Sequence, residues 1–226
     1  MPGAPIPARA TPPAEPSGAV DERAALLAVV RDLGYSRRDE PFALSSGGTS
    51  HDYVDLRRAV ARGADLRIAA TAVLAAIAAT GVGWDAIGGM TMGADPVAHA
   101  AALIGDRSWY SVRKAEKSHG SRRRIEGCDL GPGARVVVFE DTVTTGRSLL
   151  EALEAVSTTG ADVVLACTML DRGDAGARLL ARREIAYLSL LTYRDLEIEP
   201  IVADPADAPG GDVDGQLAAG GERPPG

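Results

Sequence analysis

An apolar run of sequence ends in two neighbouring carboxylates and a turn rich in hydroxyl groups. Residues 136–139 are Val-Val-Val-Phe, Glu140 and Asp141 follow at once, and the turn 142–148 precedes a predicted helix. Backbone N–H groups at a helix N-terminus bind phosphate, and Gly146 lets such a group approach the backbone closely. Carboxylates instead accept hydrogen bonds from sugar hydroxyls. A ribose phosphate would satisfy both parts, and the segment is neither a GxxxxGK[ST] nor a GxGxxG loop.

The second candidate site is a basic segment that spans residues 113–124. It holds six basic residues and one Glu, a formal charge of +5 before His119 is counted. The chain has only two lysines, Lys114 and Lys117, and both lie here. Because like charges repel one another, we expect this segment to become ordered only around a polyanion, and pyrophosphate fits that requirement.

Short apolar runs alternate with helical stretches along the middle of the chain. This alternation is typical of an α/β fold whose central, mainly parallel sheet is flanked by helices. Ligands of such sheets bind at the carboxyl ends of the strands, where residues 140–148 would lie. The glycine-rich residues 88–93 are expected to form a turn. We predict helices over 20–33, 64–80, 148–157 and 175–183 and one that Asp95-Pro96 opens, with Asp95 as its cap, and strands over 84–88, 108–112, 135–139, 162–170 and 185–191.

Composition and charge argue against several classes of protein. A net charge of −7 disfavours a nucleic-acid partner, because phosphate backbones need clustered Lys and Arg. The chain has neither an uncharged apolar stretch long enough for a membrane span nor an apolar signal segment at its start, so we expect a cytoplasmic protein with no membrane partner. Cys128 and Cys167 lie 39 positions apart without neighbouring His, which argues against a zinc site and against a disulfide scaffold.

The two ends of the chain differ from its middle. Six of the 14 prolines fall in residues 2–16 and five more in 200–225. Both ends have too few large apolar residues to offset the entropy of ordering. We therefore expect disordered tails over 1–18 and 201–226 and one folded domain over 19–200.

The carboxylate pair and the turn after it resemble the 5-phosphoribosyl 1-pyrophosphate (PRPP) signature of the type I phosphoribosyltransferases. That signature places hydrophobic residues before two acids and a Thr-Thr-Gly turn. The resemblance implies the type I phosphoribosyltransferase fold with a small N-terminal hood. It also implies that Glu140 and Asp141 bind the ribose hydroxyls and that the 5'-phosphate binds to Thr142, Val143, Thr144, Thr145, Gly146, Arg147 and Ser148.

The basic segment narrows this resemblance to one family. Its pattern RKxxKxHG, with IEG at 125–127, closely resembles the catalytic loop of the orotate phosphoribosyltransferases, although many members have Glu where this chain has Ala115. In that family the loop closes over the active site of the neighbouring subunit of a homodimer. The resemblance implies PRPP contacts from Arg113, Lys114, Lys117 and His119, and a catalytic set of Lys114, Lys117, His119 and Asp141.

Three further segments resemble the same family. Residues 42–57 match its substrate loop, FxLxSG followed by YxDxR, with Ser45 where many relatives have Lys. Residues 88–98 resemble the loop that holds pyrophosphate. Arg172 resembles the arginine that pairs with the orotate carboxylate, a role that suits a planar guanidinium, and Thr144 is the other residue expected to contact orotate.

Two histidines lie outside the basic segment. His51 belongs to the substrate loop, where it could reach a ligand, whereas His99 has Ala neighbours on a predicted helix and is expected to be structural.

The resemblance implies transfer of the phosphoribosyl group from PRPP to N1 of orotate, which yields orotidine 5'-monophosphate and pyrophosphate in pyrimidine (UMP) synthesis. Mg²⁺ would be the cofactor, held mainly by substrate oxygens and water rather than by dedicated protein ligands. The expected partners are PRPP, orotate and a second copy of the chain. Two other functions stay open. One is transfer to another base, and the other is a nucleotide-sensing, RNA-binding regulator of the same fold, for which the Arg-rich patches at 57–62 and 182–183 are short.

Overall fold

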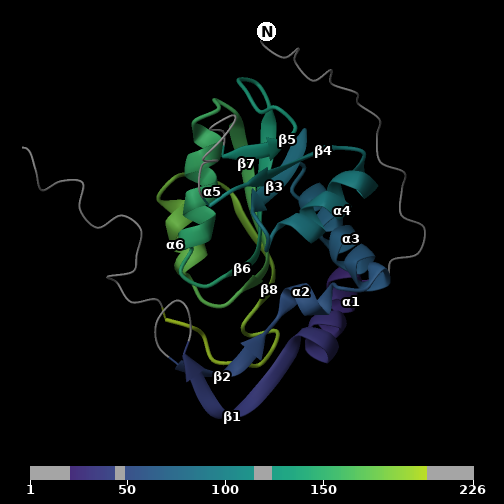
Figure 1. The fold of residues 1–226 in the computed structure, drawn as a ribbon, viewed down its shortest axis with the longest axis vertical. Helices are drawn as coiled ribbons and strands as arrows, with labels where there is room; N and C mark the ends of the chain where they lie inside the picture. The colour runs from purple at the N-terminus through teal and green to yellow at the C-terminus, as the bar shows by residue number, and fades with distance from the viewer. Residues whose placement is uncertain (1–20, 44–48, 115–123, 203–226) are drawn as a thin grey trace, which may run out of the picture.

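The computed structural model describes residues 21–43, 49–114 and 124–202. Within these ranges, six strands form one sheet in the order β5-β4-β3-β6-β7-β8 (Figure 1). Neighbouring strands are parallel except at the edge, where β5 runs antiparallel to β4. The predicted α/β fold with a mainly parallel sheet is therefore confirmed. The strands are β3 Ala86–Met90, β4 Ser108–Val112, β5 Ile125–Gly127, β6 Arg135–Val143, β7 Asp162–Asp171 and β8 Tyr187–Thr192.

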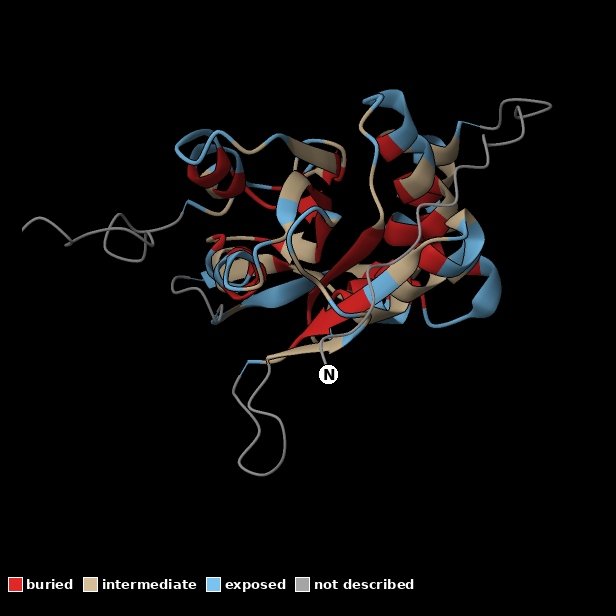
Figure 2. Ribbon diagram, turned by 90° about the horizontal axis from the view of Figure 1, so that it is seen from above, coloured by how far each residue is buried: buried red, intermediate tan, exposed pale blue. Residues whose placement is uncertain are grey.

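Helices cover both faces of this sheet because the side chains of its central strands alternate between two cores. On β6, Val137 and Phe139 pack with α1, α3 and α4, whereas Val136 and Val138 pack with α5 and α6. Figure 1 shows these two groups of helices on opposite sides of the sheet, and Figure 2 shows the buried strands between helices with exposed outer surfaces. The helices are α1 Glu22–Val29, α3 Gly63–Ala79, α4 Asp95–Gly105, α5 Arg147–Ser157 and α6 Ala175–Ala181.

A two-stranded hairpin forms the small N-terminal hood, at the bottom of the molecule in Figure 1. Its strands β1 (Tyr35–Ala43) and β2 (Thr49–Val54) pair antiparallel, and their register shifts between Arg37 and Phe42. The short helix α2 (Leu56–Ala59) follows the hairpin and leads back to the main domain.

The strand β3 differs from its predicted extent. It spans Ala86–Met90 rather than 84–88, so Gly88 and Gly89 lie within the strand and not in a turn. A Cβ atom at Gly88 would collide with the carbonyl oxygen of Tyr110 on β4, and one at Gly89 would collide with that of Phe139 on β6. The two glycines thus allow close packing against both neighbouring strands, and the turn begins only after Met90.

The strand β6 continues four residues beyond its predicted end at Phe139. Glu140, Asp141, Thr142 and Val143 belong to the strand because β7 continues alongside them. The helix predicted over 20–33 is also different in the structure. The helix α1 ends at Val29, and the chain continues as a π-helical turn, η1 (Val30–Gly34). The prediction also missed β1, β2, α2 and β5.

The predicted tails lie almost entirely outside the described residues, so the domain limits stay predictions. No helix in the described ranges is long and apolar enough to cross a membrane.

Candidate active site

A cavity of about 390 Å³ lies where the carboxyl ends of the central strands meet the segment that follows the hood. Parallel strands present their carboxyl ends at one edge, so residues far apart in the sequence meet here. The turn after β3, the residue Lys114 after β4 and the end of β6 all contribute. The lining residues are Tyr53, Val54, Asp55, Leu56, Arg57, Met90, Thr91, Met92, Gly93, Lys114, Glu140, Asp141, Thr142 and Ser148.

Glu140 and Asp141 bring two carboxylates to this cavity. Glu140 is only 5% exposed, and its Oε2 has no hydrogen-bond partner among the described residues. Burial and the charge of Asp141 raise the pKa of Glu140 well above its ordinary value, while the charge of Lys114 opposes the shift. The Oδ1 atom of Asp141 accepts the N–H of Thr142 at 2.8 Å. Burial raises the pKa of Asp141 as well, and the nearby charge of Arg57 lowers it. Glu140 Oε2 therefore lacks a polar partner of the kind that a sugar hydroxyl would supply.

The turn after β6 encloses a second cavity of about 210 Å³, lined by Glu140 and residues 142–149. Gly146 adopts a left-handed conformation, with φ of 81°, and is the N-cap of α5. Gly146 has no side chain to cap this helix, and the N–H of Arg147 donates to the Thr145 hydroxyl at 3.4 Å. An α-helix leaves its first N–H groups without an intrahelical acceptor. Every predicted phosphate-binding residue from Thr142 to Ser148 lines this cavity. The geometry suits an anion at the helix N-terminus.

The described ends of the basic segment, Arg113-Lys114 and Arg124, lie between β4 and β5. The N–H of Arg113 donates to the carbonyl oxygen of Arg124 at 2.8 Å, so the two ends of the segment lie side by side. The Arg113 side chain is 3.5 Å from Glu126 Oε1 and Lys114 lines the larger cavity. The predicted contact residues Lys117 and His119 lie outside the described residues, as does Ser45.

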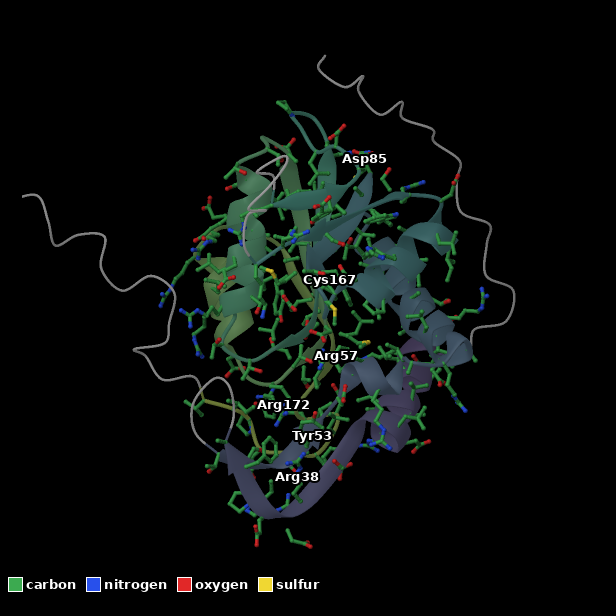
Figure 3. The ribbon with its side chains drawn as sticks, viewed as in Figure 1. Arg38, Tyr53, Arg57, Asp85, Cys167 and Arg172 are labelled. Carbon is green, nitrogen blue, oxygen red and sulfur yellow. The ribbon has the colours of Figure 1, made fainter. Side chains whose placement is uncertain are left out.

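Arg172 lies at the end of β7, beside the hood, and is only 4% exposed. Its Nη2 donates to the carbonyl oxygen of Asp52 on β2 at 3.3 Å, and its Nε has no partner among the described residues. Burial lowers its pKa, and the charge of Asp52 opposes that effect. Figure 3 shows Arg172 between Arg57 and the hairpin residue Tyr53. A buried guanidinium with an unpaired donor is ready for an anion, although Arg172 lines neither of the two cavities.

Comparison with known proteins identifies the family of the chain. The orotate phosphoribosyltransferase of Streptomyces avermitilis is 44% identical over 162 residues, which cover 70% of this chain and 86% of that protein. That of Corynebacterium glutamicum is 38% identical over 179 residues, or 78% of this chain and 95% of that protein. This chain belongs to the orotate phosphoribosyltransferase family.

A solved orotate phosphoribosyltransferase has the same fold. The Mycobacterium tuberculosis enzyme in complex with PRPP is 34% identical to this chain and superposes with a TM-score of 0.63, over 78% of this chain and 99% of that one. No protein-family model matches the chain. The family assignment confirms the resemblance that the carboxylate pair and the basic segment carry, and it favours orotate phosphoribosyltransferase over an RNA-binding regulator.

Sequence reasoning about this orotate phosphoribosyltransferase missed two groups of polar residues. Asp52 is buried on β2, where it accepts the Tyr35 hydroxyl at 2.9 Å and an Arg37 N–H at 3.0 Å. Asp95 was predicted to cap α4, but Ala94 is the N-cap and the Asp95 side chain bonds to Thr91 and Ser111 instead. A polar residue that bonds across elements carries no local sequence signal, so only the fold reveals these contacts.

The two remaining histidines have contrasting surroundings in this enzyme. His51 Nδ1 lies 2.9 Å from the carbonyl oxygen of Arg38 and does not line either cavity, so its contact with a ligand stays a prediction. His99 lies on α4 and bonds to Ser111.

Proposed function

We propose that this chain transfers the phosphoribosyl group of PRPP to N1 of orotate, which gives orotidine 5'-monophosphate and pyrophosphate. The observation that carries the proposal is the buried Glu140 with its neighbour Asp141, between the N-terminus of α5 and Lys114. This arrangement combines a phosphate site at the helix N-terminus, acceptors for sugar hydroxyls at the two acids, and a cation at Lys114. The family assignment and the PRPP complex of the Mycobacterium tuberculosis relative support the same substrate.

PRPP would lie across both cavities. Its 5'-phosphate would bind at residues 142–148, and its ribose hydroxyls would donate to Glu140 and Asp141. Its pyrophosphate would lie between residues 91–93 and Lys114, which border the larger cavity. Arg113, Lys117 and His119 would add charge to this end of the site when the basic segment closes.

The chemistry then needs positioning and charge more than a covalent partner. N1 of orotate loses its proton and bonds to the anomeric carbon as the bond from that carbon to the pyrophosphate oxygen breaks. The electron pair of the broken bond leaves with pyrophosphate, which takes up the proton. Positive charge that develops on the ribose ring is stabilised by the carboxylate of Asp141 and by that of Glu140. Negative charge on pyrophosphate is neutralised by Lys114 and the basic segment, and closure of the segment excludes water.

Mg²⁺ fits the donor set of this site. Glu140 Oε2 is buried without a partner beside a second carboxylate, and oxygen atoms are the ligands that Mg²⁺ prefers. We propose that the ion is held by PRPP oxygens and water next to Glu140 and Asp141. Bound there, it supplies positive charge to the pyrophosphate group.

The acceptor end of the site is assigned to Arg172 and Thr144. Arg172 would pair with the orotate carboxylate through its unpaired Nε. Transfer to a different base is the alternative, and it is less well supported because relatives that are 38% and 44% identical to this chain are named for orotate.

We also propose a homodimer in which the basic segment of one subunit serves the site of the other. Leu103 and Ile104 on α4 and Trp109 on β4 are exposed by 83%, 41% and 42%. Strand β4 leads directly into the basic segment, so a second copy seated on these apolar side chains would bring the two segments to the interface.

An acceptor assay tests the proposed function. Purified protein is incubated with PRPP, Mg²⁺ and either orotate, uracil, hypoxanthine or adenine, and pyrophosphate release is measured. We expect turnover with orotate alone. The Glu140→Gln/Asp141→Asn double variant should have lost PRPP binding by isothermal titration while its circular dichroism spectrum is unchanged. Turnover with another base would refute the assignment of orotate as the acceptor. Unchanged PRPP affinity in the double variant would refute the role of Glu140 and Asp141 in binding PRPP.

A further inference from the structure

The carboxylate of Asp95 joins the turn after β3 to the strand β4. Asp95 is the first residue of α4, and its Oδ2 lies 2.5 Å from the Thr91 hydroxyl oxygen. Its Oδ1 lies 2.7 Å from the hydroxyl oxygen of Ser111 on β4. His99, one turn further along α4, places its Nε2 at 3.2 Å from the same Ser111 oxygen. One carboxylate thus contacts two elements that border the larger cavity.

The hydrogen atoms in this cluster follow from the donors available. An ionised carboxylate only accepts, so Thr91 and Ser111 must each donate their single hydroxyl proton to Asp95. The Ser111 oxygen can then only accept from His99, which requires the His99 tautomer that carries its proton on Nε2. The His99 ring also packs against Trp109 at a tilt of 49°, with ring centroids 4.2 Å apart. The carboxylate oxygens of Asp95, the Ser111 hydroxyl and His99 Nε2 therefore each have one assigned role in the cluster.

Both ends of the cluster lead to groups that border the cavity. Thr91 lines the cavity itself, and its backbone N–H donates to the carbonyl oxygen of Val112 on β4 at 2.9 Å. Ser111 lies on β4, three residues before Lys114, which follows the end of that strand. The turn also lies close to Asp141, since a Cβ atom at Gly93 would lie 2.7 Å from Asp141 Oδ1. A shift of the turn would therefore alter the space beside Asp141 as well.

We propose that Asp95 is a positioning residue that sets the distance between the turn 91–93 and Lys114, and thereby the affinity for the pyrophosphate group of PRPP. The inference rests on the proposed placement of pyrophosphate between these two elements. Asp95 touches no substrate in this arrangement. It acts through the hydroxyls of Thr91 and Ser111, and His99 orients the Ser111 hydroxyl toward it.

The test compares Asp95→Ala with Asp95→Asn and with Asp65→Ala. Hydrogen bonds to a charged acceptor are strong, so the loss of two of them should raise the KM for PRPP and the Kd for pyrophosphate about tenfold, while the KM for orotate changes less than twofold. Asn can still accept one hydroxyl and donate to the other, because hydroxyls also accept, so Asp95→Asn should recover most of the affinity. Asp65 is an acid in the first turn of α3, and its removal should leave both constants unchanged.

Two results would overturn the inference. One is an unchanged Kd for pyrophosphate in Asp95→Ala, and the other is a parallel rise of both KM values with a lower Tm, which indicates a merely structural role. If Asp95→Ala does not fold, Ser111→Ala takes its place, since it removes the contact to β4 without altering a residue that lines the cavity. Ser111→Ala should raise the Kd for pyrophosphate about threefold, which corresponds to roughly the weaker end of the range of free energies for one hydrogen bond. An unchanged Kd in this variant would overturn the inference.

A separate variant distinguishes this inference from the proposed function. Lys114→Met removes a cation that lines the cavity and should weaken pyrophosphate binding whatever Asp95 does. If Lys114→Met weakens binding and Asp95→Ala does not, only the role of Asp95 is wrong. If neither variant weakens binding, the placement of pyrophosphate itself is wrong.

Discussion

Glu140 lies at the end of a strand with its carboxylate almost out of contact with water, a placement that folding by itself does not favour. Nothing in the described part of the chain pairs with its Oε2, and the neighbouring Asp141 adds a second negative charge. Strained or unpaired groups of this kind persist where function requires them. Stability and substrate affinity should therefore respond in opposite directions to changes at this residue.

Glu140→Gln is expected to make the protein more stable at neutral pH. Burial raises the pKa of Glu140 well above 4.5, so the folded state keeps this proton at pH values where the unfolded state has released it. The stability contributed by the proton is complete below about pH 4.5 and is lost as the pH rises through the folded pKa. An amide undergoes no such loss. We expect a higher Tm for the variant at pH 8, by roughly 2–4 °C for each kcal/mol gained, and no difference near pH 4. A Tm difference that does not vary with pH would contradict this explanation.

Arg172 should govern the affinity for the acceptor rather than for PRPP. Its guanidinium is buried, its Nε is unpaired, and a planar fork pairs with a carboxylate in a way that an ammonium cannot. Arg172→Lys and Arg172→Met are both expected to raise the KM for orotate by about tenfold or more, since a hydrogen bond to a charged group contributes roughly 1.5–3 kcal/mol. The KM for PRPP serves as the internal control. Equal effects on both substrates would mean that Arg172 only holds the hood to the sheet.

At the scale of elements, the phosphate turn depends on how α5 begins. Gly146 occupies a left-handed conformation as its N-cap, and a Cβ atom there would lie 3.1 Å from Leu179 Cδ2 on α6. Gly146→Ala should lower the free energy of unfolding by about 1–2 kcal/mol, the usual penalty of this conformation for other residues. It should also weaken phosphate binding, because the first N–H groups of α5 would turn away from the cavity. Urea denaturation and titration with inorganic phosphate measure the two effects. If the variant is less stable but keeps its full affinity for phosphate, the substitution does not reorient the N–H groups that bind phosphate.

The sequence allowed the carboxyl edge of the sheet to be predicted, and the reasons are local. The run 136–139 is apolar on both faces, so a buried central strand follows, and the acids and hydroxyls after it must lie at the strand end. By contrast, Gly88 and Gly89 have the composition of a turn, and only the approach of β4 and β6 explains why they lie in a strand. The burial of Arg172 could not be predicted because it depends on the hood hairpin. Strand β1 is mostly exposed and β2 is mainly polar, so neither has an apolar alternation that would predict it. Contacts between distant elements, such as Asp95 with Ser111, left no signal in either segment.

At the scale of the whole molecule, the ends of the chain should be dispensable. Their content of Pro and Gly leaves them without enough apolar surface to join the core. Deletion of residues 1–17 and of residues from 205 onward should leave both turnover and the cooperative melting transition within experimental error of the full chain. Loss of either property in the shortened protein would show that a terminal segment docks on the domain.

The assembly decides whether one subunit can complete the site of another. A Lys117→Ala subunit would have a defective basic segment and a sound carboxylate pair, whereas a Glu140→Gln/Asp141→Asn subunit would have the opposite defect. If the segment acts across the interface, a mixed dimer has one site in which both parts are sound. Mixing the two inactive homodimers should therefore restore activity, to about a quarter of the wild-type value if subunits exchange at random and the two sites are independent.

Salt provides a second measurement on the same mixture. The segment carries a formal charge of +5 and pyrophosphate is a polyanion, so the restored activity should fall as added salt screens their attraction. Subunit exchange must be verified first, for example by native mass spectrometry of tagged subunits. If exchange is complete and no activity returns, the basic segment serves the subunit that carries it. In that case the two sites are independent, and the dimer interface has no part in the transfer of the phosphoribosyl group.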